Sequence, residues 1–95
     1  MEAEIIEVSW SEDGVEWTVE ELAARSRFTE AELRELLDWG ALPRRGDLVL
    51  PALRAAARLR SDFELDLAGV ALAMTLLRRI DELETRLSRL RALAP

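Results

Sequence analysis

The side chains of this 95-residue sequence that could do chemistry are 19 carboxylates, 13 arginines and five serines. The sequence has no histidine, cysteine or tyrosine, so it lacks the commonest metal ligands, every thiol nucleophile and the side chain that titrates nearest neutral pH. No histidine is present to activate a serine, the four glycines are scattered, and no spacing of acids matches a calcium loop. We therefore expect no enzymatic activity, no metal and no other cofactor.

The charged residues are unevenly distributed along the chain. Residues 1–43 hold 12 acids and 3 bases, a net charge of −9, whereas residues 44–95 hold 7 acids and 10 bases, a net charge of +3. An acidic first half repels a phosphate backbone and steers a basic partner toward itself, although surface charge that only keeps a small protein in solution is the alternative. The arginines placed to contact nucleic acid are Arg34, Arg44 and Arg45, and an ordinary solvated turn also explains the last two.

The sequence indicates a cytoplasmic protein that does not cross a membrane. It has no cysteine for a disulfide framework, and its N-terminus is acidic where a signal peptide would be basic. Its longest uncharged run, Leu67 to Leu77, is 11 residues, about half of the ~20 that a membrane span needs. This run predicts a buried helix.

The first half has the pattern of a helix-turn-helix. Residues 4–10 and 15–17 predict a short hairpin or edge strand around the turn at 11–14. Two capping boxes follow, in residues 18–21 and 29–32, each preceded by an aromatic residue that pairs with a leucine five positions later. They predict short helices over 19–25 and 30–39, the second ending at Gly40.

The second half predicts a wing and two further helices. Residues 41–50 have the pattern of a small hairpin, and Pro51 suits the first position of a helix that ends near Phe63. Asp66 is the expected cap of the last helix. The predicted fold is mainly α, one structural domain with a winged helix-turn-helix region over 1–65 and a C-terminal dimerisation helix over 66–95. The predicted core holds eight apolar side chains: Leu22, Leu33, Leu36, Leu42, Leu53, Leu59, Phe63 and Val70.

The last helix carries an apolar stripe with alternating steps of four and three residues. Its members are Leu76, Ile80, Leu83, Leu87 and Leu90. The stripe spans only about two heptads, and helical segments below ~12–15 residues are marginal in water. It must therefore pack on the chain's own body or on a second copy. We favour a homodimer, because so small a winged unit has little of its own chain left to cover a long helix. The relative direction of the two helices is left open by the mixed charges that flank the stripe.

The order of these elements resembles the MerR-type winged helix domain, and within it the chaperone-modulatory proteins of the CbpM family. The most telling match is Ala57-Arg58-Leu59-Arg60 followed by Leu65-Asp66-Leu67-Ala68-Gly69-Val70-Ala71, and the resemblance covers about residues 15–92. It implies a non-enzymatic modulator that binds and inhibits the J-domain of a DnaJ-like co-chaperone of the CbpA type. Such a modulator limits the stimulation of the chaperone DnaK.

The second helix departs from the pattern of DNA-binding relatives. It keeps Leu33 and Arg34 but has Glu30, Ala31, Glu32, Glu35 and Leu36 where those relatives have Val, Arg, Thr, Tyr and Tyr. Acidic side chains oppose contact with phosphates, which makes a MerR-type DNA-binding transcription regulator the alternative rather than the leading hypothesis. The residues predicted to bind the partner are Glu30, Glu35 and Asp38, with Ile6 and Trp10 as apolar anchors. Trp17 and Trp39 are assigned to packing.

Overall fold

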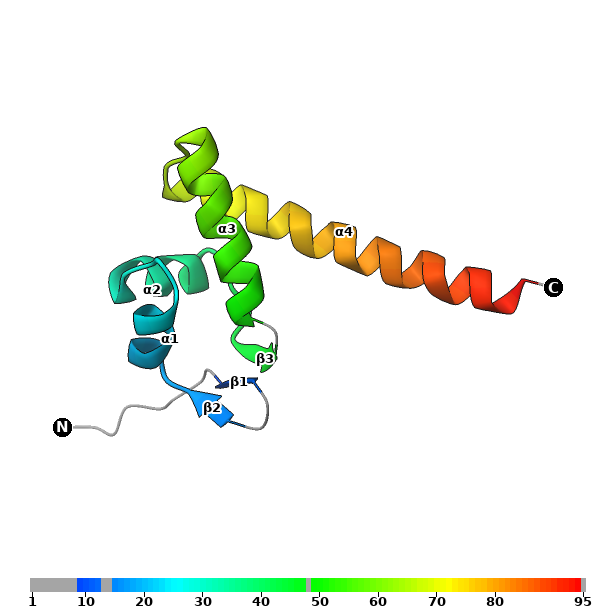
Figure 1. Cartoon of the computed structure of the whole chain (residues 1–95), viewed down its shortest axis with the longest axis horizontal. Helices are drawn as coiled ribbons and strands as arrows, with labels where there is room; N and C mark the ends of the chain where they lie inside the picture. Colours follow the sequence, from blue (N-terminus) through cyan, green and yellow to red (C-terminus); the bar gives the residue numbers. More distant parts are fainter. Residues whose placement is uncertain (1–8, 13–14, 48, 95) are drawn as a thin grey trace.

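A computed structural model describes residues 9–12, 15–47 and 49–94. It confirms a mainly helical fold in which a long C-terminal helix extends away from a small body (Figure 1). The molecule measures 60 × 33 × 22 Å along its principal axes. The elements in chain order are β1 (Ser9–Glu12), β2 (Val15–Trp17), α1 (Val19–Arg25), α2 (Glu30–Asp38), β3 (Arg45–Asp47), α3 (Val49–Phe63) and α4 (Leu67–Leu93).

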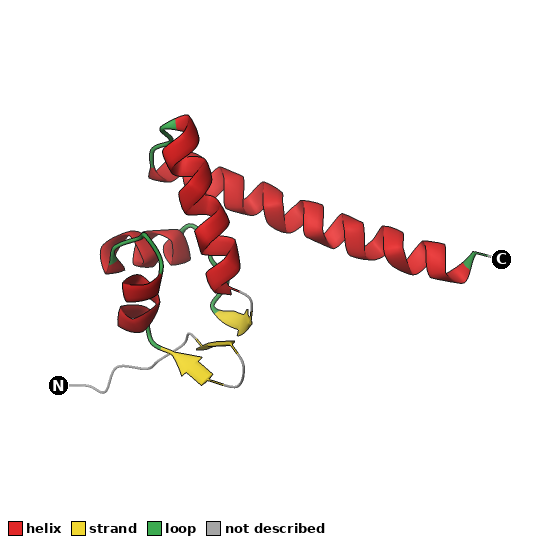
Figure 2. Cartoon of the chain, viewed as in Figure 1, coloured by secondary structure: helices red, strands yellow, loops and turns green. Residues whose placement is uncertain are grey.

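The strands form one small sheet at the base of the body, in the order β2-β1-β3 (Figure 2). The predicted antiparallel pairing at the N-terminus is confirmed for β1 and β2, with Trp10 opposite Trp17, but Ser11 and Glu12, predicted in the turn, belong to β1. Residues 4–8 of the predicted first strand lie outside the described residues. The predicted hairpin over residues 41–50 is wrong. The described residues of that range form one strand, β3, which pairs parallel to β1, with Ser9 opposite Arg45. This pairing joins segments 36 residues apart, so local turn chemistry could not indicate it.

Both capping boxes of the helix-turn-helix are confirmed. In each, the threonine Oγ1 accepts a hydrogen bond from the backbone N–H three residues later, at 3.1 Å, and the glutamate at that position accepts one from the threonine N–H. α2 ends at Asp38 with Trp39 as its C-cap, and Gly40 adopts a positive φ of 78°, as the sequence predicted for the end of this helix. α1 and α2 therefore start and stop where local side chains satisfy their free backbone groups.

α3 begins two residues before the predicted start. Pro51 lies third in the helix rather than first, which is tolerated because the N–H groups of the first turn have no acceptor within the helix. The predicted end at Phe63 is confirmed, and the chain then turns at Glu64, whose φ is 53°.

A single core joins the helices to the sheet. Six of the eight predicted core side chains are buried: Leu22, Leu33, Leu36, Leu42, Leu53 and Val70. Leu59 is only partly buried, and Phe63 is wrongly predicted, being 68% exposed. Phe63 continues the apolar pattern of α3 but lies in its last turn, which extends beyond α2 (Figure 1).

Within the described residues, α4 packs on the body from its start to Arg78. The predicted cap is confirmed, since the Asp66 side chain accepts a hydrogen bond from the Gly69 N–H at 2.8 Å. Val70 and Met74 are buried, and Arg78 then donates hydrogen bonds to the carbonyls of Gly40 and Ala41 in the loop after α2. From Arg79 to Ala94 every residue of the chain is exposed.

Candidate functional site

α2 separates an apolar face from a charged one. Leu33, Leu36 and Leu37 are buried, at the spacing that places them on one side of a helix. The residues on the opposite side are exposed, namely Ala31, Arg34, Glu35 and Asp38. In a helix-turn-helix this is the helix whose outward side reads the major groove.

Ion pairs neutralise two of the four acids of α2. Glu30 pairs with Arg34 one turn away, at 2.8 Å between Oε2 and Nη2. Glu32 accepts two hydrogen bonds from the Arg60 guanidinium of α3, at 2.7 and 3.2 Å, and so ties α2 to α3. These bonds lower the pKa of the Glu32 carboxyl, against an opposing effect of burial. Within the described residues, Glu35 and Asp38 have no ion-pair partner.

We call Glu30, Glu35 and Asp38 the acidic face of α2. All three are on one helix, as the sequence predicted, with Glu35 and Asp38 exposed and Glu30 partly buried. The one arginine of this helix, Arg34, is already paired with Glu30. Because Arg34 is paired in this way, the acidic face keeps a negative charge, which repels phosphate and attracts a cationic partner.

One of the two predicted apolar anchors, Trp10, is not available on this surface. The prediction of Trp10 as an anchor is wrong. Only 1% of its area is exposed, and its Nε1–H donates to the Pro43 carbonyl at 2.8 Å, so it belongs to the core. Ile6 lies outside the described residues. Trp39, which the sequence assigned to packing, is instead 50% exposed beside the acidic face. Nothing in the local sequence distinguishes the two tryptophans, because their burial depends on strand pairing and on how α2 ends.

The basic residues predicted to contact nucleic acid are not on one element. Arg34 is on α2, Arg44 lies in the loop that follows, and Arg45 opens β3. Arg44 and Arg45 are exposed.

The apolar stripe of α4 (Leu76, Ile80, Leu83, Leu87 and Leu90) is not covered by the described residues. Its members are 45–65% exposed. Leu76 follows the buried Met74 by two residues, a rotation of about 200° around a helix, so the stripe runs along the side of α4 that faces away from the body. Leu72, which is 61% exposed, likewise follows the buried Val70 by two residues, so it lies on the same side of α4 and extends the stripe toward the body.

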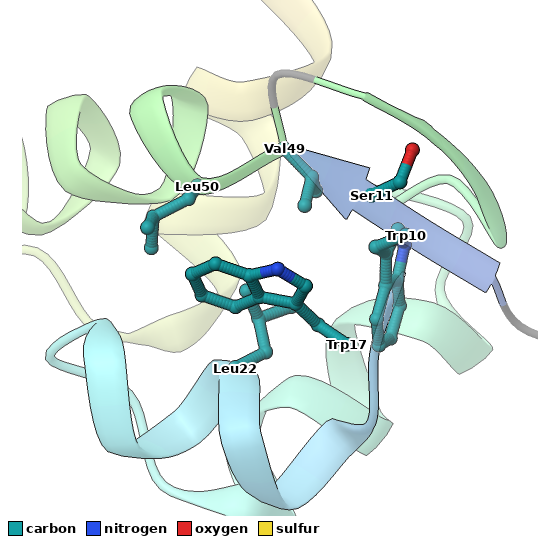
Figure 3. Close-up of a pocket in the computed structure, with 6 residues that line it drawn as sticks. All are labelled: Trp10, Ser11, Trp17, Leu22, Val49 and Leu50. Carbon is teal, nitrogen blue, oxygen red and sulfur yellow. The ribbon is translucent and has the colours of Figure 1, made fainter. Parts of the chain in front are cut away.

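A small pocket lies between the sheet and the helices (Figure 3). Its lining is largely apolar and leaves no room for a bound molecule: Trp10, Ser11, Trp17, Leu22, Val49 and Leu50. The Trp17 Nε1–H is buried near it without a hydrogen-bond partner in the described structure. The described residues also contain no group of three acids that could hold a metal ion.

No helix in the described part of the chain combines the length and apolar character that a membrane crossing requires.

Comparison with known proteins gives one match. Residues 47–92 match the model of a family described as MerR HTH family regulatory protein. The matched range runs from the end of β3 through α3 and nearly all of α4, and it supports a MerR-like family. No curated protein and no solved structure matches the chain.

Proposed function

We propose that this chain is a non-enzymatic, cytoplasmic modulator that binds and inhibits the J-domain of a DnaJ-like co-chaperone. The observation that carries the proposal is the acidic face of α2, in the position where a DNA-binding relative presents its recognition helix. The identity of the partner comes from the resemblance to the CbpM family, whose telling segments lie inside the matched range. A J-domain presents a basic helix to DnaK, and an acidic surface that occupies this helix would compete with DnaK.

The test is the ATPase activity of DnaK stimulated by the co-chaperone. Adding this protein should reduce the stimulated rate to the basal rate of DnaK and leave the basal rate itself unchanged. Excess J-domain should restore the stimulation, because the inhibitor acts on the J-domain and not on DnaK. Stimulation that persists at saturating protein would contradict the proposal.

The apolar stripe of α4 is proposed as the seam of a homodimer. An apolar strip about 27 Å long, from Leu72 to Leu90, runs along the side of α4 away from the body, and uncovered strips of this kind mark association sites. The steps of four and three residues are those of a coiled coil, in which a second copy supplies the complementary surface.

Light scattering at a protein concentration of tens of micromolar should give the mass of a dimer. Changing Leu83 and Leu87 to Glu should give a monomer whose body is still folded, because neither residue contacts the core. Changing the exposed Thr85 and Ser88 to Glu is the matched control, because it adds the same two negative charges to the same helix outside the stripe. A monomeric wild-type protein would contradict the dimer.

The family match favours a second candidate, a MerR-type DNA-binding regulator. Its contacts would be Arg34, Arg44 and Arg45, with the acidic face turned toward phosphate. We expect no sequence-specific complex, because Glu35 and Asp38 oppose the DNA backbone and α2 has no Asn or Gln to read adenine. A nanomolar complex with a defined duplex at physiological salt would make this the leading function.

A further inference from the structure

Trp39 is an exposed aromatic residue at the edge of the acidic face of α2. Half of its surface is exposed. Its backbone remains helical, since the Trp39 N–H donates to the Glu35 carbonyl at 2.9 Å. Side chains four residues apart on a helix are neighbours, so the Trp39 ring and the Glu35 carboxylate border the same patch of surface.

The molecule itself shows what such a pair binds. Phe28 lies just before the N-cap of α2 and four residues before Glu32, and the Arg60 guanidinium contacts both side chains. Its Cζ lies 5.4 Å from the centre of the Phe28 ring, while Nη2 lies 2.7 Å from Glu32 Oε2. In this chain an aromatic ring and a carboxylate thus hold one guanidinium together, by cation–π attraction and by charged hydrogen bonds, here with the ring preceding the carboxylate in the chain.

A second pair in the body repeats the preference. The Arg25 guanidinium lies 4.6 Å from the centre of the Trp17 ring, which shows an indole serving as the platform for an arginine in this same chain. Tryptophan is the best of the aromatic platforms for a cation.

The backbone that carries Trp39 is held in place before any partner arrives. Arg78 of α4 donates hydrogen bonds to the Gly40 carbonyl at 3.2 Å and to the Ala41 carbonyl at 3.4 Å. Gly40 itself donates to the Leu37 carbonyl at 3.0 Å, which closes the last turn of α2. A backbone segment that is already fixed loses little freedom on binding.

We propose that Trp39 and Glu35 form the anchor site for an arginine on a basic helix of the partner protein, with Asp38 adding attraction. This inference rests on the proposed function and names the side-chain chemistry that the acidic face selects. Arginine fits better than lysine, because its planar guanidinium stacks on an indole and still donates to a carboxylate at its edge. Trp39 takes the place of the buried Trp10 as the apolar anchor of the surface.

The experiment measures the affinity of variants for two probes. The probes are the J-domain of the DnaJ-like co-chaperone, and a short helical peptide with arginines on one face beside its counterpart in which citrulline, a neutral analogue, replaces arginine. The variants are Trp39→Ala, Trp39→Phe and Glu35→Gln. Phe63→Ala is the control, since Phe63 is an exposed aromatic residue on another element, at 68% against 50% for Trp39. Circular dichroism checks that each variant is folded.

We expect Trp39→Ala to weaken binding of the J-domain at least about tenfold, as for an interface anchor. Trp39→Phe and Glu35→Gln should each cost about threefold, and Phe63→Ala less than about twofold. The arginine peptide should bind in a Trp39-dependent manner, and the citrulline peptide should not bind.

The two probes separate failure of this inference from failure of the proposed function. Equal affinity of wild type and Trp39→Ala for both probes would overturn the anchor site while the proposed function stands. If the J-domain does not bind wild type, the proposed function fails. Binding of the arginine peptide to wild type and to Trp39→Ala then tests the anchor site by itself. Trp39-dependent binding of duplex DNA in place of the arginine peptide would also overturn it.

Discussion

The ion pair between Glu32 and Arg60 predicts a specific loss of stability in the variant Glu32→Gln. The pair joins α2 to α3 through two hydrogen bonds, and the two side chains are 24% and 33% exposed. Glutamine keeps the capping box with Thr29, because Gln serves at this position as well as Glu, but it removes the charge that faces Arg60. Partial exposure to solvent screens the interaction. We therefore expect the free energy of unfolding to fall by about 1 kcal/mol, between the values for surface and buried ion pairs.

A loss of this size lowers the melting temperature by about 4–8 °C in a domain of this length. Glu30→Gln is the matched control, since its pair with Arg34 is 40% and 53% exposed and should contribute less than about 0.5 kcal/mol. Thermal and urea unfolding by circular dichroism measure both variants. The protein concentration is held fixed, because the stability of a dimer depends on it.

The pH dependence gives a second check on the same pair. The folded protein holds the pKa of Glu32 below the usual 4.5, so the stabilisation is complete above pH 4.5 and is lost as the pH falls through the lowered value. The difference in free energy of unfolding between wild type and Glu32→Gln should therefore become smaller as the pH falls. A neutral-pH loss no larger than that of Glu30→Gln, or a difference independent of pH, would refute the reasoning.

Two further pairs of variants test the packing by urea unfolding. Trp10→Phe should cost about 1–3 kcal/mol because it leaves the Pro43 carbonyl without its hydrogen bond, whereas Trp17→Phe should cost less because it removes an N–H that has no partner. Leu53→Ala should cost about 2–5 kcal/mol, since Leu53 is fully buried, and Phe63→Ala less than about 0.5 kcal/mol, since its ring is exposed. A reversed order in either pair would contradict the assigned environments.

The elements that the sequence predicted well are those decided by neighbours in the chain. Thr18 and Thr29 meet their glutamates within three residues, so both helix starts were predicted correctly. The spacing of the apolar stripe likewise predicted a surface that the body leaves uncovered.

The errors concern contacts between distant segments. The pairing of β1 with β3 and the bond from Arg60 to Glu32 link positions 28 or more residues apart, and neither leaves a local signature. Trp10 is buried and Trp39 is half exposed, the reverse of what the sequence predicted, because burial of an indole depends on what packs against it. The acidic character of α2 needed no tertiary information, since its residues are on one short helix.

Binding of the J-domain to the acidic face of α2 is measured with wild type and with the double variant Glu35→Arg and Asp38→Arg, by isothermal titration for the affinity and by stopped-flow mixing for the association rate. We predict that wild type binds with an association rate that falls as salt rises, and that the double variant loses most of the affinity while keeping its helical spectrum. Wild type that gives no heat with the J-domain at micromolar concentrations, or a double variant that binds as tightly as wild type, would contradict the proposed role of α2.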